Sequence, residues 1–120
     1  MFQEVKDTLP ISGDDYDAQI IREIKACAID LTSSAEINLP GEINITMELS
    51  QQGGRTITDT STLTDEFVIT VISVWCNMRI GNPPNYDNLL KAYESLKGQL
   101  RLSKPYTTYG GGPDADDDQL

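Results

Sequence analysis

The longest apolar run of the chain, FVITVISVWCNM at residues 67–78, constrains the fold more than any other segment. A membrane-spanning helix needs about 20 consecutive apolar residues. Asp65 and Glu66 precede the run and Arg79 follows it, so it is too short to cross a bilayer. We therefore expect a buried element of a soluble domain, and no membrane association.

Polar residues within and beside this run decide between a strand and a helix. Glu66, Thr70, Ser73 and Asn77 are spaced four, three and four, so they form one narrow stripe along a helix. A half-buried strand would instead show polar residues at every second position. The β-branched residues each lower helix propensity by only about a few tenths of a kcal/mol, which burial outweighs. The run is therefore predicted to be a buried central helix.

This central helix is predicted to cover residues 63–80. Thr64 is placed to cap its start, and Leu63 and Val68 are placed for a hydrophobic staple. We expect its larger apolar residues to be mostly buried, namely Phe67, Ile72, Val74, Trp75 and Met78.

Helical spacing also predicts three further helices. Phe2, Val5 and Leu9 indicate a short helix that ends before Pro10. A long helix is predicted at 14–33, after a serine cap at Ser12 and acids that suit a helix N-terminus. Another long helix is predicted at 85–102. The apolar faces of the two long helices comprise Tyr16, Ile20, Ile24, Cys27 and Leu31 in the first, and Tyr86, Leu89, Leu90, Tyr93, Leu96 and Leu100 in the second.

Alternation replaces helical spacing between the first long helix and the central one. Ile43, Ile45, Met47 and Leu49 alternate with polar residues, which is typical of a half-buried strand. The following SQQGG is turn chemistry, and RTIT can return as a second strand. We therefore predict a β-hairpin at 43–60. A two-stranded hairpin is marginal alone, so it must lean on the helices or on a neighbouring subunit.

The expected fold class is mainly α, a bundle of three long helices with a short N-terminal helix and with the hairpin inserted between the first and second long helices. One domain is predicted at 1–103, followed by a flexible acidic C-terminal tail at 104–120 that contains YGGGPDADDD. The predicted core comprises Ile20, Ile24, Phe67, Ile72, Trp75, Leu89, Tyr93 and Leu96.

Composition argues against catalysis and against simple nucleic-acid binding. The 120 residues include 9 Lys and Arg, 19 Asp and Glu and no His, giving a net charge of −10. An acidic surface repels phosphates, and the absence of His removes the commonest general base and metal ligand. Cys27 and Cys76 lie in apolar patterns, where buried thiols are favoured and a disulfide is the alternative. We expect no enzyme activity, no cofactor and no metal.

Lys97, Arg101 and Lys104 lie four and three apart and form a basic stripe. These cations either offset the negative end of a helix or form a contact strip toward an acidic surface of another subunit or partner. In the tail, Tyr106 and Tyr109 are either anchors that dock on a partner or part of a solubilising appendage.

The stretch after Trp75 resembles the head–tail connector family of tailed bacteriophages, whose members are also described as putative DNA-packaging proteins. The resemblance covers about 15–33 and 63–106, and three segments carry it most clearly: NPPNYD at 82–87, YESLK at 93–97, and LRLS at 100–103 followed by Tyr106. Two features depart from the family, namely Leu102 in place of a glycine found in one branch, and a longer hairpin.

The resemblance implies a structural virion protein at the head–tail interface, assembled in the cytoplasm of the bacterial host. Copies would form a homo-oligomeric ring, dodecameric in the family, beneath the portal protein. The ring would extend the DNA channel and offer a platform for a stopper or tail-completion protein. DNA would pass without specific binding, which suits an acidic wall.

A different class of protein remains as the alternative, a small acidic interaction protein that mimics DNA and inhibits a host DNA-binding protein. Such a protein needs carboxylates at phosphate-like spacing on a rigid surface. Here four of the nineteen acids, Asp114, Asp116, Asp117 and Asp118, lie in the predicted tail. The connector hypothesis is therefore favoured over the DNA-mimic alternative.

Overall fold

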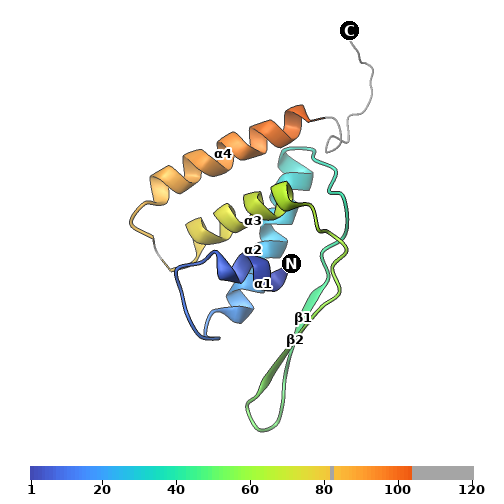
Figure 1. Cartoon of the computed structure of the whole chain (residues 1–120), viewed down its shortest axis with the longest axis vertical. Coiled ribbons are helices and arrows are strands. Elements are labelled where there is room, and N and C mark those ends of the chain that lie inside the picture. Colours follow the sequence, from blue (N-terminus) through green and yellow to red (C-terminus); the bar gives the residue numbers. More distant parts are fainter. Residues whose placement is uncertain (82, 104–120) are drawn as a thin grey trace.

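The computed structural model describes residues 1–81 and 83–103, and in this part of the chain the fold is mostly helical with one two-stranded antiparallel hairpin (Figure 1). The elements in chain order are α1 (Phe2–Asp7), α2 (Asp17–Ile29), a π-helical turn (Asp30–Ser34), β1 (Ile45–Leu49), β2 (Arg55–Asp59), α3 (Glu66–Arg79) and α4 (Tyr86–Leu102). The predicted tail at 104–120 lies outside the described residues.

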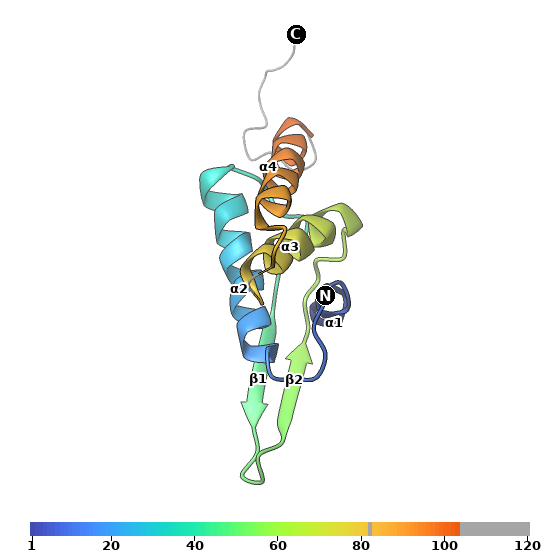
Figure 2. The same cartoon turned by 90° about the vertical axis from the view of Figure 1, so that its left-hand side faces the viewer.

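The long apolar run forms α3, as predicted, and α3 packs against α1, α2 and α4 (Figure 2). Its predicted cap is wrong by one residue. The side chain of Asp65, not that of Thr64, accepts a hydrogen bond from the N–H of Val68 at 3.0 Å. A carboxylate satisfies a free N–H group and also faces the positive end of the helix dipole.

The polar stripe of α3 is only partly open to solvent, because α1 lies against α3. Glu66 and Thr70 are exposed, whereas Ser73 is buried and Asn77 is half-buried. The Ser73 hydroxyl donates to the carbonyl of Ile69 at 2.8 Å, and the Asn77 amide donates to the carbonyl of Thr8 at 3.3 Å. Short polar side chains therefore let α1 approach without leaving a buried donor unsatisfied.

The helix predicted at 14–33 is shorter at its start and changes geometry at its end. Tyr16 is the N-cap of α2 and makes no side-chain capping bond, so the predicted cap at Ser12 is wrong. Gly13 adopts a positive φ of 79°, which turns the chain before the helix begins. At the other end, the N–H of Ala35 bonds to the carbonyl of Asp30 at 3.3 Å, the wider spacing of a π-helical turn.

The hairpin forms as predicted, with shorter strands than the range 43–60. Its register pairs Ile45 with Asp59, Met47 with Ile57 and Leu49 with Arg55. Gly53 adopts a positive φ of 86° in the turn. The hairpin extends below the helices, and its tip is the part farthest from α4 (Figure 1).

Gly41 allows the two chain segments at the base of the hairpin to meet. A Cβ atom at this position would lie 2.6 Å from the Cα of Leu63, and the φ of Gly41 is 143°. Only glycine fits such a close approach of two backbones with this conformation. The chain therefore enters the hairpin directly beside the segment that leaves it for α3.

The predicted core is confirmed in part. Ile20, Ile24, Ile72 and Tyr93 are buried, and so is Met78. The other residues predicted to be buried are only half-buried, namely Phe67, Val74, Trp75, Leu89 and Leu96. Four of these five, all except Leu89, pack against the buried cluster. On α3, Phe67, Val74 and Trp75 are spaced seven and one apart, so they share a side of the helix that the other elements cover incompletely.

The capping residue of α3 can be tested by substitution. Asp65→Ala removes the capping acceptor and is expected to lower the free energy of unfolding by about 1 kcal/mol, measured by urea titration. Thr64→Ala, one residue earlier on an exposed side chain, is the matched control and should change stability by less than about 0.5 kcal/mol. A larger loss for Thr64→Ala than for Asp65→Ala would contradict the assignment.

Candidate functional site

The basic stripe predicted on α4 does not form a continuous exposed surface. Lys97 turns inward, and only 16% of its side chain is exposed. Its Nζ lies 3.2 Å from Asp30 Oδ2 and 3.4 Å from Glu94 Oε1. Arg101 is exposed and has no ion-pair partner among the residues that the structure describes. Lys104, Tyr106 and Tyr109 lie outside those residues.

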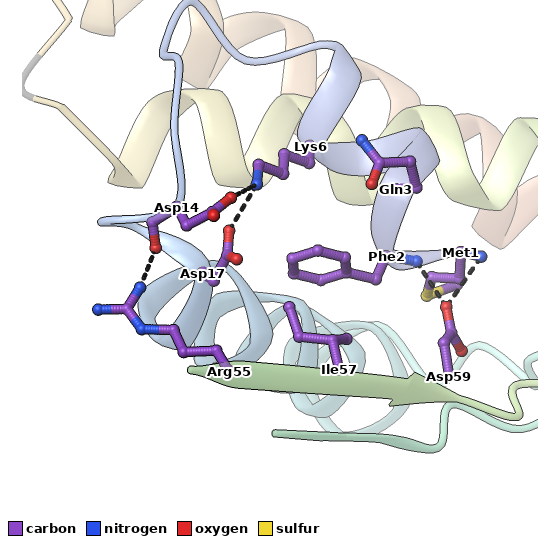
Figure 3. Close-up of a pocket in the computed structure, with 9 residues that line it drawn as sticks. All are labelled: Met1, Phe2, Gln3, Lys6, Asp14, Asp17, Arg55, Ile57 and Asp59. Atoms are coloured by element: carbon purple, nitrogen blue, oxygen red, sulfur yellow. Dashed lines mark hydrogen bonds and ion pairs between the residues drawn. The ribbon is translucent and has the colours of Figure 1, made fainter. Parts of the chain in front are cut away.

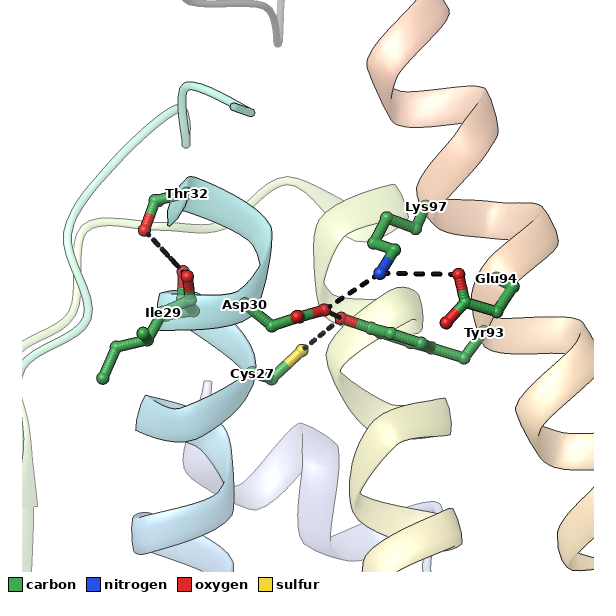
Figure 4. Close-up of polar contacts among 8 residues, drawn as sticks. Cys27, Ile29, Asp30, Thr32, Tyr93, Glu94 and Lys97 are labelled. Atoms are coloured by element: carbon green, nitrogen blue, oxygen red, sulfur yellow. Dashed lines mark hydrogen bonds and ion pairs between the residues drawn. The ribbon is translucent and has the colours of Figure 1, made fainter. Parts of the chain in front are cut away.

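Lys97 belongs to a polar cluster where α4 crosses the end of α2 (Figure 4). The Tyr93 hydroxyl donates to Asp30 Oδ2 at 2.5 Å, and the Sγ of Cys27 lies 3.8 Å from the same hydroxyl oxygen. The Lys97 ammonium also lies 5.1 Å from the centre of the Tyr93 ring. One carboxylate of the π-helical turn after α2 therefore holds two side chains of α4, one turn apart.

Local structure explains why Asp30 reaches this position. Asp30 is the first residue of the π-helical turn that continues α2, and its side chain points toward α4 (Figure 4). On α4, Tyr93 and Lys97 are four residues apart and so share one face of the helix. The helix crossing thus places a donor pair opposite a single acceptor group.

The electrostatics of the cluster keep each group in its ordinary charge state. Burial alone would raise the pKa of Asp30, but hydrogen bonds from Tyr93 and Lys97 outweigh it and lower that pKa. Burial and the neighbouring acids raise the pKa of the Tyr93 phenol. Burial raises the pKa of the Cys27 thiol to about 12. A neutral thiol is a weak nucleophile, and the contacts of this cluster position α4 against the π-helical turn that continues α2.

Tyr93 joins this cluster to a second group of contacts. Its ring packs edge-on against Trp75, with centroids 5.1 Å apart. The indole N–H of Trp75 donates to Glu23 Oε1 at 3.0 Å, and Arg79 Nε lies 3.4 Å from the same oxygen. The Arg79 guanidinium also stacks 5.1 Å from the Trp75 ring. A half-buried Trp75 is therefore held by both polar and ring contacts.

A cleft of about 400 Å³ lies between α1, the start of α2 and β2 (Figure 3). Lys6 Nζ lies 2.8 Å from Asp17 Oδ1 and 3.0 Å from Asp14 Oδ1, and the hydrogen bond to Asp17 is the main cause that raises the pKa of Lys6. Asp17 is buried at 4% exposure. One lysine at this end of the cleft therefore pairs with two carboxylates of the same chain.

The same cleft shows how the hairpin is fastened to the helices. The Arg55 guanidinium donates to the carbonyl oxygen of Asp14. At the other end of β2, Asp59 Oδ2 accepts the N–H of Phe2 at 2.7 Å, and Oδ1 accepts the N–H of Ser61 at 3.0 Å. Burial opposes the ionisation of Asp59, but these hydrogen bonds lower its pKa strongly. The cleft is thus a structural joint in which Arg55 and Asp59 tie β2 to the segments beside it.

The part of the chain that the structure describes contains neither a metal-holding side-chain group nor a membrane-spanning helix. Residues 1–81 and 83–103 contain no group of three His, Cys, Asp or Glu side chains able to hold a metal ion. Within the same ranges, no helix is long and apolar enough to cross a membrane. Asp14 and Asp17 pair with Lys6 instead of gathering around a cation site.

Sequence reasoning missed the two acids that organise these contacts, Glu23 and Asp30. The predicted apolar face of the first long helix did not include Glu23, yet its side chain is only 13% exposed. One signal was present in the sequence. Glu23, Cys27 and Asp30 are spaced four and three, so both acids lie on the helical stripe of a buried cysteine.

Comparisons with protein-family models, with curated proteins and with solved structures gave no match for this chain.

The cluster around Asp30 gives a stability prediction. Tyr93→Phe removes a hydrogen bond to a charged acceptor and is expected to lower the free energy of unfolding by about 1.5–3 kcal/mol near neutral pH, measured by urea titration. Tyr86→Phe makes the same chemical change on an exposed ring of α4 and should cost less than about 0.5 kcal/mol.

The same substitution predicts a dependence on pH. Because the pKa of Asp30 is lowered in the folded state, its contribution is present above the unfolded value of about 3.9 and is lost as pH falls below it. The stability difference between wild type and Tyr93→Phe should therefore be smaller at about pH 3 than at about pH 7, with the decrease occurring at the acidic end of this range. A constant difference across this range would show that the charge on Asp30 does not strengthen its hydrogen bond with Tyr93.

Proposed function

We propose that this protein is a head–tail connector subunit of a tailed bacteriophage. In this proposal α2, α3 and α4 form the three-helix body of a subunit, and copies form a ring, dodecameric as in the family that the sequence resembles. The ring lies beneath the portal protein of the virion, extends the DNA channel and receives a stopper or tail-completion protein. The role needs no catalysis and no cofactor.

The observation that carries the proposal is the presence of two separate exposed apolar ends. Leu49, at the turn end of β1, is 68% exposed, and Leu102, at the end of α4, is 87% exposed. They are the last residues of β1 and of α4, two elements that lie toward opposite ends of the molecule (Figure 1). A subunit between a portal and a tail protein needs more than one contact surface, and exposed apolar side chains are suited to such contacts.

The segments that resemble the connector family are divided between packing and surface. Both YESLK and LRLS begin on α4 with a buried residue, Tyr93 and Leu100 respectively. Glu94, Arg101 and Leu102 are exposed. This division supports the proposal, because one helix can be fixed to the body and still offer a face to a neighbour.

Charge supports the proposed channel. The chain carries a net charge of −10, and a ring of such subunits would repel the phosphates of the passing DNA. Low affinity for DNA lets it move through the channel without being held.

The proposal is tested by mixing the purified full-length protein with the portal protein encoded in the same genome. Negative-stain electron microscopy is expected to show an added ring of density on one face of the portal. If the protein leaves the portal unchanged but is captured by a nuclease or repressor of the host, the DNA-mimic alternative replaces the connector.

A charge reversal on α4 tests the contact surface. Arg101→Glu is expected to weaken attachment to the portal or ring assembly, because it places an acid at the exposed end of an already acidic chain. Lys91→Glu makes an equivalent charge change at an exposed position near the start of the same helix and serves as the matched control. Circular dichroism should show both variants folded, and equal attachment by the two would exclude this end of α4 from the contact.

A further inference from the structure

We propose that copies of this chain join through the edges of the hairpin, with β2 of one copy paired to β1 of the next. The inference rests on the proposed function and deepens it, because it names the contact between neighbouring subunits of the ring. Its partner is a second copy of the same chain.

The first observation concerns backbone groups on the two outer edges. In an antiparallel pair, hydrogen-bonded residue pairs alternate with non-bonded pairs. Ser50 and Gly54 are bonded at one end of the hairpin, and Asn44 and Thr60 at the other. The register then assigns outward-pointing N–H and C=O groups to Ile45, Met47, Leu49, Arg55, Ile57 and Asp59.

None of these outward backbone groups has a hydrogen-bond partner among residues 1–81 and 83–103. Edges of this kind accept another strand readily, and folded proteins usually cover them or protect them with charge. Here the edges are exposed toward the tip of the hairpin, at Leu49 and Arg55, and this tip stands clear of the helices (Figure 2), whereas Ile45 at the base of β1 is buried. A two-stranded sheet gains stability when further strands are added.

The second observation is an apolar row that continues beyond the helical body. Ile45, Met47 and Leu49 share one face of β1, and their exposure rises along the strand, from buried through half-buried to 68%. Ile57, half-buried on β2, faces Met47 across the hairpin. If a neighbouring copy adds β1 to this β2 in the same register, its Met47 lies beside Ile57 and extends the apolar row.

Two hairpins can join through two β1 edges, through two β2 edges or through one edge of each kind, and charge distinguishes these three contacts. On the polar face, Glu48 is the charged residue of β1, whereas β2 presents Thr56 and Thr58. Two β1 edges would bring two Glu48 carboxylates onto the same face of adjoining strands, where they repel. A β2–β1 contact places Glu48 beside Thr56, the same pairing that already exists within the hairpin.

Two β2 edges paired symmetrically about Ile57 would place Arg55 opposite Asp59, but both side chains already serve the fold. Arg55 donates to the Asp14 carbonyl, and Asp59 accepts the N–H of Phe2. The β2–β1 contact leaves these bonds intact. Because it joins two different edges, it is head-to-tail and propagates around a ring, whereas contacts between like edges stop at a dimer.

The proposed pairing is tested with two single-cysteine additions, Thr46→Cys and Thr58→Cys. Between copies, these residues would face each other at a non-hydrogen-bonded site, where Cα atoms are about 4.5 Å apart and a disulfide can form. Each variant is oxidised alone and in an equal mixture, with and without the portal protein. We expect a covalent dimer linked through positions 46 and 58 in the mixture, identified by mass spectrometry of its peptides.

A dimer of any other composition, or no covalent dimer in the mixture, overturns the assignment. A dimer from Thr46→Cys alone indicates contact between two β1 edges, and one from Thr58→Cys alone indicates contact between two β2 edges. Wild-type protein reports any background from the buried Cys27 and Cys76. Rings on the portal without the 46–58 link overturn the hairpin contact and leave the connector function standing. The link in a protein that does not attach to the portal supports the contact and removes the connector function.

A backbone variant provides an independent measurement. Leu49→Pro removes an outward N–H of β1, and Leu49→Thr removes the same apolar side chain but keeps that N–H. Introduced into the Thr46→Cys protein, the proline is expected to reduce the yield of the 46–58 link well below the yield with threonine. Equal yields from two variants that show the same circular dichroism would overturn backbone pairing at the edge of β1.

Discussion

Burial of α3 is the constraint on which the rest of the fold depends. This helix is apolar along most of its circumference, and α1, α2 and α4 each cover part of it. Burying a residue such as Ile72 or Val68 contributes about 1.5–3 kcal/mol relative to leaving it in water. A helix of this kind is stable only when several neighbours surround it, so its sequence dictates the number of covering elements. The positions of those elements are then fixed by their polar contacts.

The contacts of Tyr93 fix α4 on this central helix. Apolar burial alone permits small rotations and shifts of one helix on another, because it has no preferred direction. Tyr93 adds two directional contacts, the hydrogen bond to Asp30 on the α2 side and the edge-on contact with Trp75 of α3. A rotation of α4 about its axis would break both. The rest of that helix can therefore carry exposed residues without loss of its orientation.

Much of the fold could be predicted from the sequence, because its signals are periodic. The helical stripe within FVITVISVWCNM and the alternation from Ile43 to Leu49 each have one simple structural solution. Capping and charge pairing were predicted less well. Asp65 and Thr64 are both good caps, and the sequence does not show which of them has the extended backbone of an N-cap, which in the structure is Asp65.

The surface of α4 was mispredicted for a related reason. Spacing places Lys97 and Arg101 on one stripe, but it cannot show that Asp30, 67 residues away in the chain, draws the first of them inward. Ion pairs between distant segments leave no local pattern. The sequence shows only that Glu23 and Asp30 are seven residues apart, a spacing that places both acids on the same side of a helix.

The anchoring of the hairpin bears on the proposed assembly. Arg55 bonds to Asp14, just before α2, and Asp59 bonds to Phe2 of α1, so both ends of β2 are fastened to the helical body (Figure 3). A strand that is already ordered loses less conformational freedom when it pairs with another chain than a flexible segment would. The charged groups of the cleft thus lie away from the proposed contact surface but fix the direction in which the hairpin points. Assembly through the outer edge of β2 would then follow from the same ion pairs and hydrogen bonds that hold the subunit together.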